Sequence, residues 1–422
     1  MTSADQRRRC PYCGSDVLLR NCVIVSTNQE MNGLGIGASI AFGNGSFDAD
    51  IRALGEDRFD ETSEIEAGPQ PSAGRVELSG RYPILANIPE PRPQPQTFKK
   101  IANFWSDSTD ELEPVAGRAD PRHLPRRQCP SCLLPLPEQI DDFDVHVVAV
   151  VGLNGAGKSH FLAAALTEAL RGGGLDDFGI DEFSAVGDTA AHIHRDYFVR
   201  VYREQRLFDP TPPNDRVVEE PLIFRVEVDG RQPFLLLTYD LSGEALTDHA
   251  KRAAHVSFIR RAAAVIFLAD PWDMDMVLEK LPIPEHPANR NMSQTDLLEA
   301  VLTEMELDGR EVRPHLCLTI SKADLLARVL PGPMKFLSPP TAKSDWVKNV
   351  RDVSDEVRNA LLQLGENRLV KIADRYEEVT YLAMAPLGSE TAGRKPSPLR
   401  CLEPLAVAIH MAAAAVSVAN AR

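Results

Sequence analysis

The stretch Val145-His-Val-Val-Ala-Val-Val-Gly152, which runs directly into Leu153-Asn-Gly-Ala-Gly-Lys-Ser159, decides the fold of this 422-residue chain. Its first half is almost wholly apolar and predicts a strand buried on both faces, as in a parallel sheet. Its second half completes the pattern G-x-x-x-x-G-K-[ST], and a segment of helical periodicity follows at residues 159–171. Because strand, loop and helix come in this order, we predict a phosphate-binding loop at residues 152–159 instead of a chance glycine-rich turn.

The residue types of this loop suit the chemistry of nucleotide binding. Glycines let the backbone curl so that its N–H groups converge on a phosphate, and the helix N-terminus adds a favourable dipole. Lys158 is expected to reach the β/γ oxygens of a nucleoside triphosphate, and the Ser159 hydroxyl to ligate Mg²⁺. The predicted nucleotide contacts are Gly152, Asn154, Gly155, Ala156, Gly157, Lys158, Ser159 and His160.

From residue 145 onward, buried apolar strands alternate with amphipathic helices. Further strands are expected at residues 221–228, 233–240, 263–270, 315–322 and 379–385. The pattern predicts an α/β fold of the P-loop NTPase class, with a mostly parallel sheet and helices on both faces. We place this domain at residues 141–422, with insertions at 176–209 and 271–312. The Ala-rich residues 405–418 are too few for a membrane span and predict a packed terminal helix.

A second phosphate-side element is expected where the strand at 233–240 ends in Asp240-Leu-Ser-Gly243-Glu244. A carboxylate at the tip of a buried strand is where an acid that holds Mg²⁺ belongs, usually through water. In the D-x-x-G spacing, the Gly243 N–H can contact a γ-phosphate, so that the loop behind it registers hydrolysis. The alternative, an aspartate that only caps the next helix, is the weaker interpretation because the phosphate loop lies upstream.

A base-reading element is expected at the end of the next strand but one, in Ser321-Lys322-Ala323-Asp324. In the pattern [NT]-K-x-D, the aspartate accepts hydrogen bonds from guanine N1–H and N2–H₂, which adenine cannot supply together. The lysine stem packs along the base. Ser321 replaces the usual Asn or Thr, which weakens the local support but leaves the guanine-reading Asp324 in place.

With these three motifs in order, the chain resembles the Ras-like, translation-factor-related (TRAFAC) class of P-loop GTPases from about residue 144 to the C-terminus. The resemblance implies GTP and GDP as ligands, with Mg²⁺, and a switch-I threonine that ligates Mg²⁺ and meets the γ-phosphate. Thr211 is the best match, and Thr189 is the second choice because it falls at a predicted helix start. The resemblance also implies a base-side loop after the last strand, here with Ala385 and Pro386.

Within that class, the chain resembles bacterial zinc-ribbon-linked GTPases predicted to act in multi-protein conflict, defence or signalling systems. Two positions depart from the common pattern. Asn154 replaces a small glycine, and Glu244 replaces the water-orienting Gln, so it is a candidate base or a source of repulsion. The insertion carries several arginines, of which Arg206 is a candidate for an arginine supplied in cis; the alternative is a solvated helical face. The predicted catalytic set is Lys158, Thr211, Gly243 and Glu244, and the predicted Mg²⁺ set is Ser159, Thr211 and Asp240.

Four of the seven cysteines form two C-P-x-C pairs. Such turns let four thiolates converge tetrahedrally on Zn²⁺, which predicts a structural zinc ribbon within residues 1–140, with a long insertion at 14–128 rich in Pro, Gly and acidic residues. Two unrelated turns or redox thiols are the alternative. Cys317 and Cys401 are expected to be core thiols, whereas Cys22 is either a core thiol or a spare ligand. The predicted ligands are Cys10, Cys13, Cys129 and Cys132.

The net charge of −15 argues against broad affinity for nucleic acid or for an anionic membrane. The N-terminus has no apolar signal region, so a cytoplasmic location is expected. The leading hypothesis is a Mg²⁺-dependent GTPase switch that acts on protein partners in a multi-component system. The alternatives are a nucleotide-bound scaffold with little turnover, a P-loop ATPase, and a GTP-controlled nucleic-acid binder that acts through its arginine-flanked zinc ribbon.

Overall fold

A computed structural model gives the structure of this chain. It describes residues 7–10, 16–18, 23–27, 38–42, 45–46, 126–131, 136–137, 139–140, 142–171, 174–187, 189–204, 208, 221–240, 259–281, 292–306, 314–340, 346–376, 379–388 and 396–420. The chain divides into two units, Met1–Val145 and His146–Arg422, and each is described by itself. Among the described helices, none has the length and apolar character that a membrane crossing requires.

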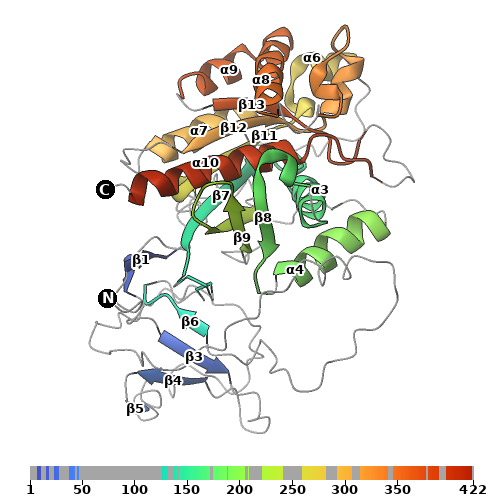
Figure 1. The fold of residues 1–422 in the computed structure, drawn as a ribbon. Coiled ribbons are helices and arrows are strands. Elements are labelled where there is room, and N and C mark those ends of the chain that lie inside the picture. Colours follow the sequence, from blue (N-terminus) through green and yellow to red (C-terminus); the bar gives the residue numbers. More distant parts are fainter. Residues whose placement is uncertain are drawn as a thin grey trace, which may run out of the picture. The chain divides into compact units, whose positions relative to one another are not determined.

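The second unit is built on a seven-stranded sheet with the order β13-β12-β11-β7-β10-β9-β8 (Figure 1). The pairs β7–β11, β11–β12 and β12–β13 are parallel, while β10–β9 and β9–β8 are antiparallel. The mostly parallel sheet expected from the continuous apolar runs is therefore confirmed. The strands are β7 Asp144–Gly152, β8 Ile180–Ala185, β9 Leu222–Val228, β10 Phe234–Asp240, β11 Ala262–Ala269, β12 His315–Ile320 and β13 Val379–Ala383.

Two groups of helices contact the sheet. The terminal helix α10 (Leu402–Asn420) contacts β11, β12 and α3, and Figure 1 shows it lying across the strands. In the second group, α8 contacts the strand β13, and α7 contacts α9. The remaining described α-helices are α3 Lys158–Leu170, α4 Thr189–His192, α6 Asp275–Lys280, α7 Gln294–Glu306, α8 Trp346–Gln363 and α9 Asn367–Ala373, with short 3₁₀ turns η5 Asp176–Phe178, η8 Pro271–Asp273, η9 Ala323–Arg328 and η10 Lys335–Leu337.

The core of this unit consists of the apolar side chains that the strands project between sheet and helices. Its largest fully buried side chains include Phe161, Phe224, Phe234, Phe267 and Phe336. The two thiols expected in the core, Cys317 and Cys401, are both buried. Burial raises the pKa of Cys317 to about 12, so this thiol stays protonated and behaves as a small apolar side chain.

Three features of this unit differ from the sequence expectation. The insertion after the phosphate loop contains a strand, β8, which pairs with β9 and ends the sheet. It also contains η6 (Ile193–Arg203), an eleven-residue π-helix, a form that is rare and concentrated at functional sites. The long helical segment before β13 is two helices, because Gly365 takes the left-handed conformation (φ 84°) that ends α8 before α9 begins.

The first unit contains short antiparallel strands around the predicted cysteine turns. Strand β1 (Arg7–Arg9) pairs with β2 (Asp16–Leu18), and Cys10 follows β1 directly. A four-stranded sheet has the order β5-β4-β3-β6. Its strands are β3 Val23–Thr27, β4 Ala38–Phe42, β5 Gly45–Ser46 and β6 Arg126–Gln128, and Cys129 follows β6.

Candidate functional site

The predicted phosphate loop joins β7 to α3 through two glycines in the left-handed region. Gly155 has φ 78° and Gly157 has φ 89°, conformations that strain any residue with a Cβ. Gly152 is required for a different reason: a Cβ built there lies 3.0 Å from the Leu268 carbonyl oxygen of the neighbouring strand β11. The loop thus has the curled backbone on which the prediction rested, and α3 begins at Lys158 directly after it.

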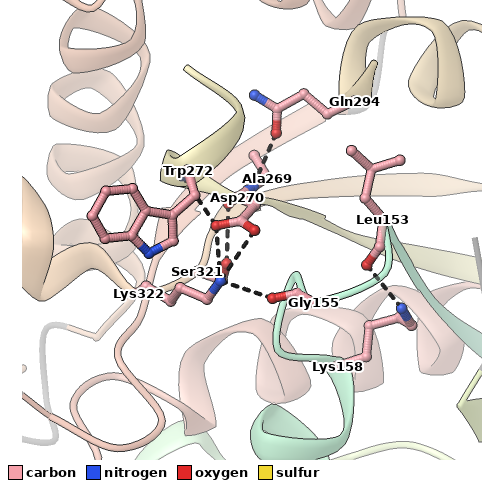
Figure 2. A network of polar contacts seen from close by, with 9 residues as sticks. All are labelled: Leu153, Gly155, Lys158, Ala269, Asp270, Trp272, Gln294, Ser321 and Lys322. Carbon is pink, nitrogen blue, oxygen red and sulfur yellow. Dashed lines mark hydrogen bonds and ion pairs between the residues drawn. The ribbon is translucent and has the colours of Figure 1, made fainter. Parts of the chain in front are cut away.

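Lys158 is buried within the loop. Its Nζ donates to the carbonyl oxygens of Gly152, at 3.0 Å, and Leu153, at 3.1 Å. These contacts hold the ammonium group against the backbone of the loop, and Figure 2 shows the Lys158 side chain turned toward Leu153. The first N–H groups of α3 have no acceptor within the helix, so this end of α3 offers both a cation and backbone donors to an anion.

The second lysine of interest, Lys322, links the predicted base-reading element to the phosphate loop (Figure 2). Its Nζ donates to the Gly155 carbonyl oxygen at 2.7 Å and to both carboxylate oxygens of Asp270 at 3.0 Å. The strand register explains the meeting. Because Ala269 of β11 pairs with Ile320 of β12, the residues that follow each strand emerge side by side at the same edge of the sheet.

Asp270 was not among the residues predicted from the sequence. Its side chain is completely buried, and besides Lys322 it accepts the Trp272 backbone N–H at 3.1 Å. The Asp270 backbone N–H donates to the Gln294 side-chain oxygen at 2.9 Å. A buried carboxylate demands such partners, so Asp270 organises η8, α7 and the Lys322 side chain around one point. The signal in the sequence was an apolar strand that ends in an acid, which is the same signal that singled out Asp240.

The backbone of Lys322 is also unusual, with φ 49° in the left-handed region. A non-glycine residue pays for this conformation, and such residues concentrate at binding sites. The neighbouring Ser321 is buried, and its hydroxyl donates to the Ala269 carbonyl oxygen at 3.2 Å. Serine therefore supports the turn through β11, in place of the larger side chain usual at this position.

Asp324 lies in the first turn of η9, two residues beyond Lys322. Burial raises the pKa of its carboxyl, and its own backbone N–H together with Arg328 and Lys322 partly opposes that rise. A desolvated carboxylate of this kind gains most when a ligand supplies hydrogen-bond donors. A backbone hydrogen bond joins this turn to the predicted base-side loop. The Ala323 N–H donates to the carbonyl oxygen of Met384, and Met384 directly precedes Ala385.

Ala385 and Pro386 are both buried, and Ala385 pairs with Leu399 through two backbone hydrogen bonds. Gly388 closes this loop with φ 75°, and a Cβ there would lie 2.5 Å from the Ser397 carbonyl oxygen. The loop is therefore fixed beside the turn that carries Lys322 and Asp324.

Several predicted residues fall outside what the structure describes. Thr211, Gly243 and Glu244 are among them, as is Arg206; for Asp240 only the backbone is described, as the last residue of β10. The second choice for switch I, Thr189, is among the described residues. It is buried at the start of α4, and its hydroxyl accepts the Ile223 backbone N–H at 3.1 Å.

The insertion contacts the phosphate loop through His160. The ring Nε2 of His160 accepts the Phe208 backbone N–H at 3.2 Å, and the two rings meet edge to face with centroids 5.0 Å apart. Burial, and then the charges of Lys322 and Arg200, lower the pKa of His160 to about 4, so the imidazole is neutral and accepts this hydrogen bond at physiological pH. On η6, Arg195 is exposed and pairs with Asp196.

Two of the four predicted zinc ligands, Cys10 and Cys129, are described, and both are buried. The Ser131 backbone N–H donates to the Cys129 sulfur at 3.4 Å, and the Leu136 N–H donates back to the Arg127 carbonyl oxygen at 2.7 Å. Cys13 and Cys132 lie outside the described residues. Within the described ranges, no group of three or more His, Cys, Asp or Glu side chains is placed to hold a metal.

This site defines the class of the protein, which is a GTPase-domain protein of the P-loop type. It combines a strand, a glycine loop with a buried lysine, a helix, and a second lysine that follows a neighbouring strand and contacts the loop. A family model described as Double-GTPase 2 matches residues 146–383, more than half of the chain, and the chain belongs to that family.

Two individual proteins are also similar to this chain. The Mycolicibacterium smegmatis protein described as "Putative ESX-1 scaffolding and assembly protein SaeC" is 25% identical over 308 residues, in a match that covers 66% of this chain and 77% of that protein. A solved structure of the small GTPase Arl6 (BBS3) from Trypanosoma brucei with the nucleotide analogue GppNp aligns with a TM-score of 0.27 and 11% identity, over 64% of this chain and 97% of that one.

Proposed function

We propose that this chain binds guanine nucleotide with Mg²⁺ in the site formed by the phosphate loop and the Ser321–Asp324 turn, and that it hydrolyses GTP as a molecular switch. The observation that carries the proposal is the Lys322 side chain, which joins the Gly155 carbonyl oxygen to the buried Asp270. This contact places the base-reading turn against the phosphate loop, so one nucleotide can occupy both. The matching family supports the proposal.

In this proposal the residues divide the work along the nucleotide. The backbone of the glycine loop and the Lys158 ammonium hold the phosphates, and the Lys322 stem lies along the base. Asp324 reads guanine. Burial opposes ionisation of its carboxyl group, so the carboxylate gains when guanine supplies two hydrogen-bond donors, and adenine leaves it unsatisfied. Ala385 and Pro386 close the base side.

The metal would be held by Ser159, Asp240 and Thr211. The curled loop, with α3 starting at its end, fits a Mg²⁺–phosphate complex, because the Ser159 hydroxyl lies in the first turn of that helix. When bound, Mg²⁺ neutralises charge that builds on the β/γ oxygens. The Gly243 N–H would contact the γ-phosphate, so that the loop behind it registers hydrolysis, and Glu244 would be the base for the attacking water.

The test is a titration of the full-length protein with a fluorescent guanine nucleotide in Mg²⁺, competed with unlabelled GTP, GDP and ATP. We expect GTP and GDP to compete and ATP not to compete, and we expect Asp324→Asn to lose this preference. The matched control is Asp352→Asn, which alters an exposed aspartate on α8. Equal competition by ATP in the wild type would replace this proposal with a P-loop ATPase.

A second candidate is a nucleotide-bound scaffold with little turnover. The observation that favours it is the similarity to a protein whose name describes scaffolding and assembly in ESX-1, a multi-component system. Asn154 in the phosphate loop and Glu244 in place of Gln agree with weakened hydrolysis. Phosphate release separates the two candidates: multiple turnovers that Lys158→Ala abolishes support the switch, whereas stoichiometric binding with no release supports the scaffold.

We also propose that the first unit holds a structural Zn²⁺ through Cys10, Cys13, Cys129 and Cys132. The support is local: an N–H group two residues after Cys129 donates to its sulfur, which favours a thiolate, and a hairpin-like return follows. Four thiolates leave no open coordination position for chemistry. Metal analysis of the purified protein should give one zinc per chain, and none for Cys10→Ser with Cys129→Ser.

A further inference from the structure

His160 is the first residue to consider, because it belongs to two structures at once. It lies in the first turn of α3, directly after Ser159, where the backbone N–H groups are those that face a bound phosphate. Its side chain contacts a residue forty-eight positions later in the sequence, because the ring Nε2 accepts the Phe208 N–H at 3.2 Å. A ligand that orders the first turn of α3 therefore also orders the backbone that carries the His160 side chain.

Phe208 in turn is held by η6. The Arg200 guanidinium carbon lies 5.0 Å from the centre of the Phe208 ring, and the Tyr197 ring centroid is 5.7 Å away. Both residues belong to the π-helix, which packs against α3. The contacts therefore run without a gap from the phosphate end of α3, through His160 and Phe208, to η6.

The winding of η6 is the second observation. A π-helix spaces its hydrogen bonds at i→i+5, is rare in proteins and is frequently found at functional sites. Elements with two discrete arrangements are those that convert a small shift at a ligand into a larger response. On η6, His194, Phe198 and Tyr202 stack in series, with successive ring centroids 5.5 Å apart, so the three rings form one continuous stack.

We propose that His160 is a positioning residue that couples nucleotide at the phosphate loop to η6 through Phe208, so that the state of η6 reports which nucleotide is bound. The inference rests on the proposed function, since it takes guanine nucleotide to be the ligand. The residue acts through a hydrogen bond to backbone, and its test therefore needs a readout other than stability.

The experiment is hydrogen–deuterium exchange on the full-length protein without nucleotide, with GDP, and with a non-hydrolysable GTP analogue, each at saturation judged from its own binding curve. The amide of Phe208 is the direct reporter, because it donates to His160. His160→Ala removes the acceptor, whereas His160→Gln keeps one at similar reach. Phe208→Leu keeps the N–H group and removes the ring contacts with η6.

In the wild type, we expect the GTP analogue and GDP to protect Phe208 and residues 193–204 to different extents. In His160→Ala, we expect protection of the Phe208 amide to fall by about five-fold or more, the worth of one hydrogen bond, and the nucleotide dependence at η6 to disappear. His160→Gln should retain most of both. Phe208→Leu should keep nucleotide-dependent protection of its own amide and lose it on η6.

Two results overturn the inference while the proposed function stands: guanine nucleotide binds the wild type but exchange on η6 is the same in all three states, or His160→Ala shows the wild-type nucleotide dependence. A wild type that binds no guanine nucleotide shows a different failure, that of the proposed function, and the inference falls with it.

Discussion

Replacing Asp270 by Asn is the change whose effect the structure defines most sharply. The Asp270 carboxylate is completely buried, receives the Lys322 ammonium on both oxygens at 3.0 Å, and also accepts the Trp272 N–H. Asparagine retains an oxygen for Trp272, but its –NH₂ group opposes another donor at Lys322. We expect lower stability and weaker guanine-nucleotide binding, because Lys322 loses the partner that holds it against Gly155.

The magnitude follows from the burial of the two groups. Breaking a fully buried ion pair by removing one partner costs about 3–5 kcal/mol. The Lys322 side chain is 30% exposed, so water offsets part of the loss. We therefore expect a loss of about 2–3 kcal/mol in the free energy of unfolding, or about 5–10 °C in Tm for a unit of this size. If about half of this loss is expressed in the site, guanine-nucleotide affinity falls about ten-fold.

The matched control is Asp352→Asn, which removes an aspartate paired with Lys335 at the same 3.0 Å separation but with both side chains exposed. An exposed pair is worth about 0–1 kcal/mol, so its Tm and affinity should hardly change. Differential scanning calorimetry and the nucleotide titration measure the two effects. Equal Tm shifts for the two variants, or a destabilised Asp270→Asn with unchanged guanine affinity, would refute the role assigned to Asp270.

Three further predictions rest on single groups. Burial and two neighbouring aspartates raise the pKa of Glu366 from 4.5 to about 7, so ionisation of this group costs the fold stability as pH rises from 4.5 to 7, and the full loss is present above pH 7. Glu366→Gln should therefore raise the free energy of unfolding by about 1–3 kcal/mol at pH 8 and hardly at all at pH 4, and an equal gain at both pH values would contradict this. Burial raises the pKa of Asp324 in the unliganded protein, whereas guanine favours the ionised carboxylate, so the affinity for GDP should be highest above that pKa and should fall as pH falls through it. The same pH dependence of GDP binding in Asp324→Asn would count against this prediction. Thr189→Val leaves the half-buried Ile223 N–H without the acceptor that the buried Thr189 hydroxyl supplies, and it should cost about 1–3 kcal/mol in the free energy of unfolding with unchanged nucleotide preference. Thr303→Val, at an exposed position of α7, should cost under about 1 kcal/mol, and comparable losses would show that the Thr189 contact is not the cause.

Much of the sheet could be predicted from the sequence because its strands are continuous apolar runs that end in polar groups. The expected β7, β9, β10, β11, β12 and β13 are all present within one or two residues of their predicted ends. The phosphate loop could also be located from a local pattern, because its glycines take conformations that other residues adopt only with strain.

Other features depended on information that no local pattern contains. Asp270 and Lys322 lie 52 residues apart, and only the register between β11 and β12 brings them together. The sequence Ile180-Asp-Glu-Phe-Ser-Ala is short and charged, and it forms β8 because β9 offers an edge to pair with. The π-helical winding of η6 has no distinct periodicity over eleven residues, so the sequence predicts only a helix there.

Strand β8 has a consequence for how this chain avoids self-association. It is the last strand of the sheet, and the row of backbone groups on its outer side would otherwise be a template for pairing with another chain. Its pairing with β9 shifts register between Ile180 and Glu182, and Glu182 accepts from Arg225 of β9 at 3.0 Å, which places charge along the border. Irregular and charged edges resist edge-to-edge aggregation. A protein that docks on this side by adding a strand would have to match the irregular register and the charged side chains of β8.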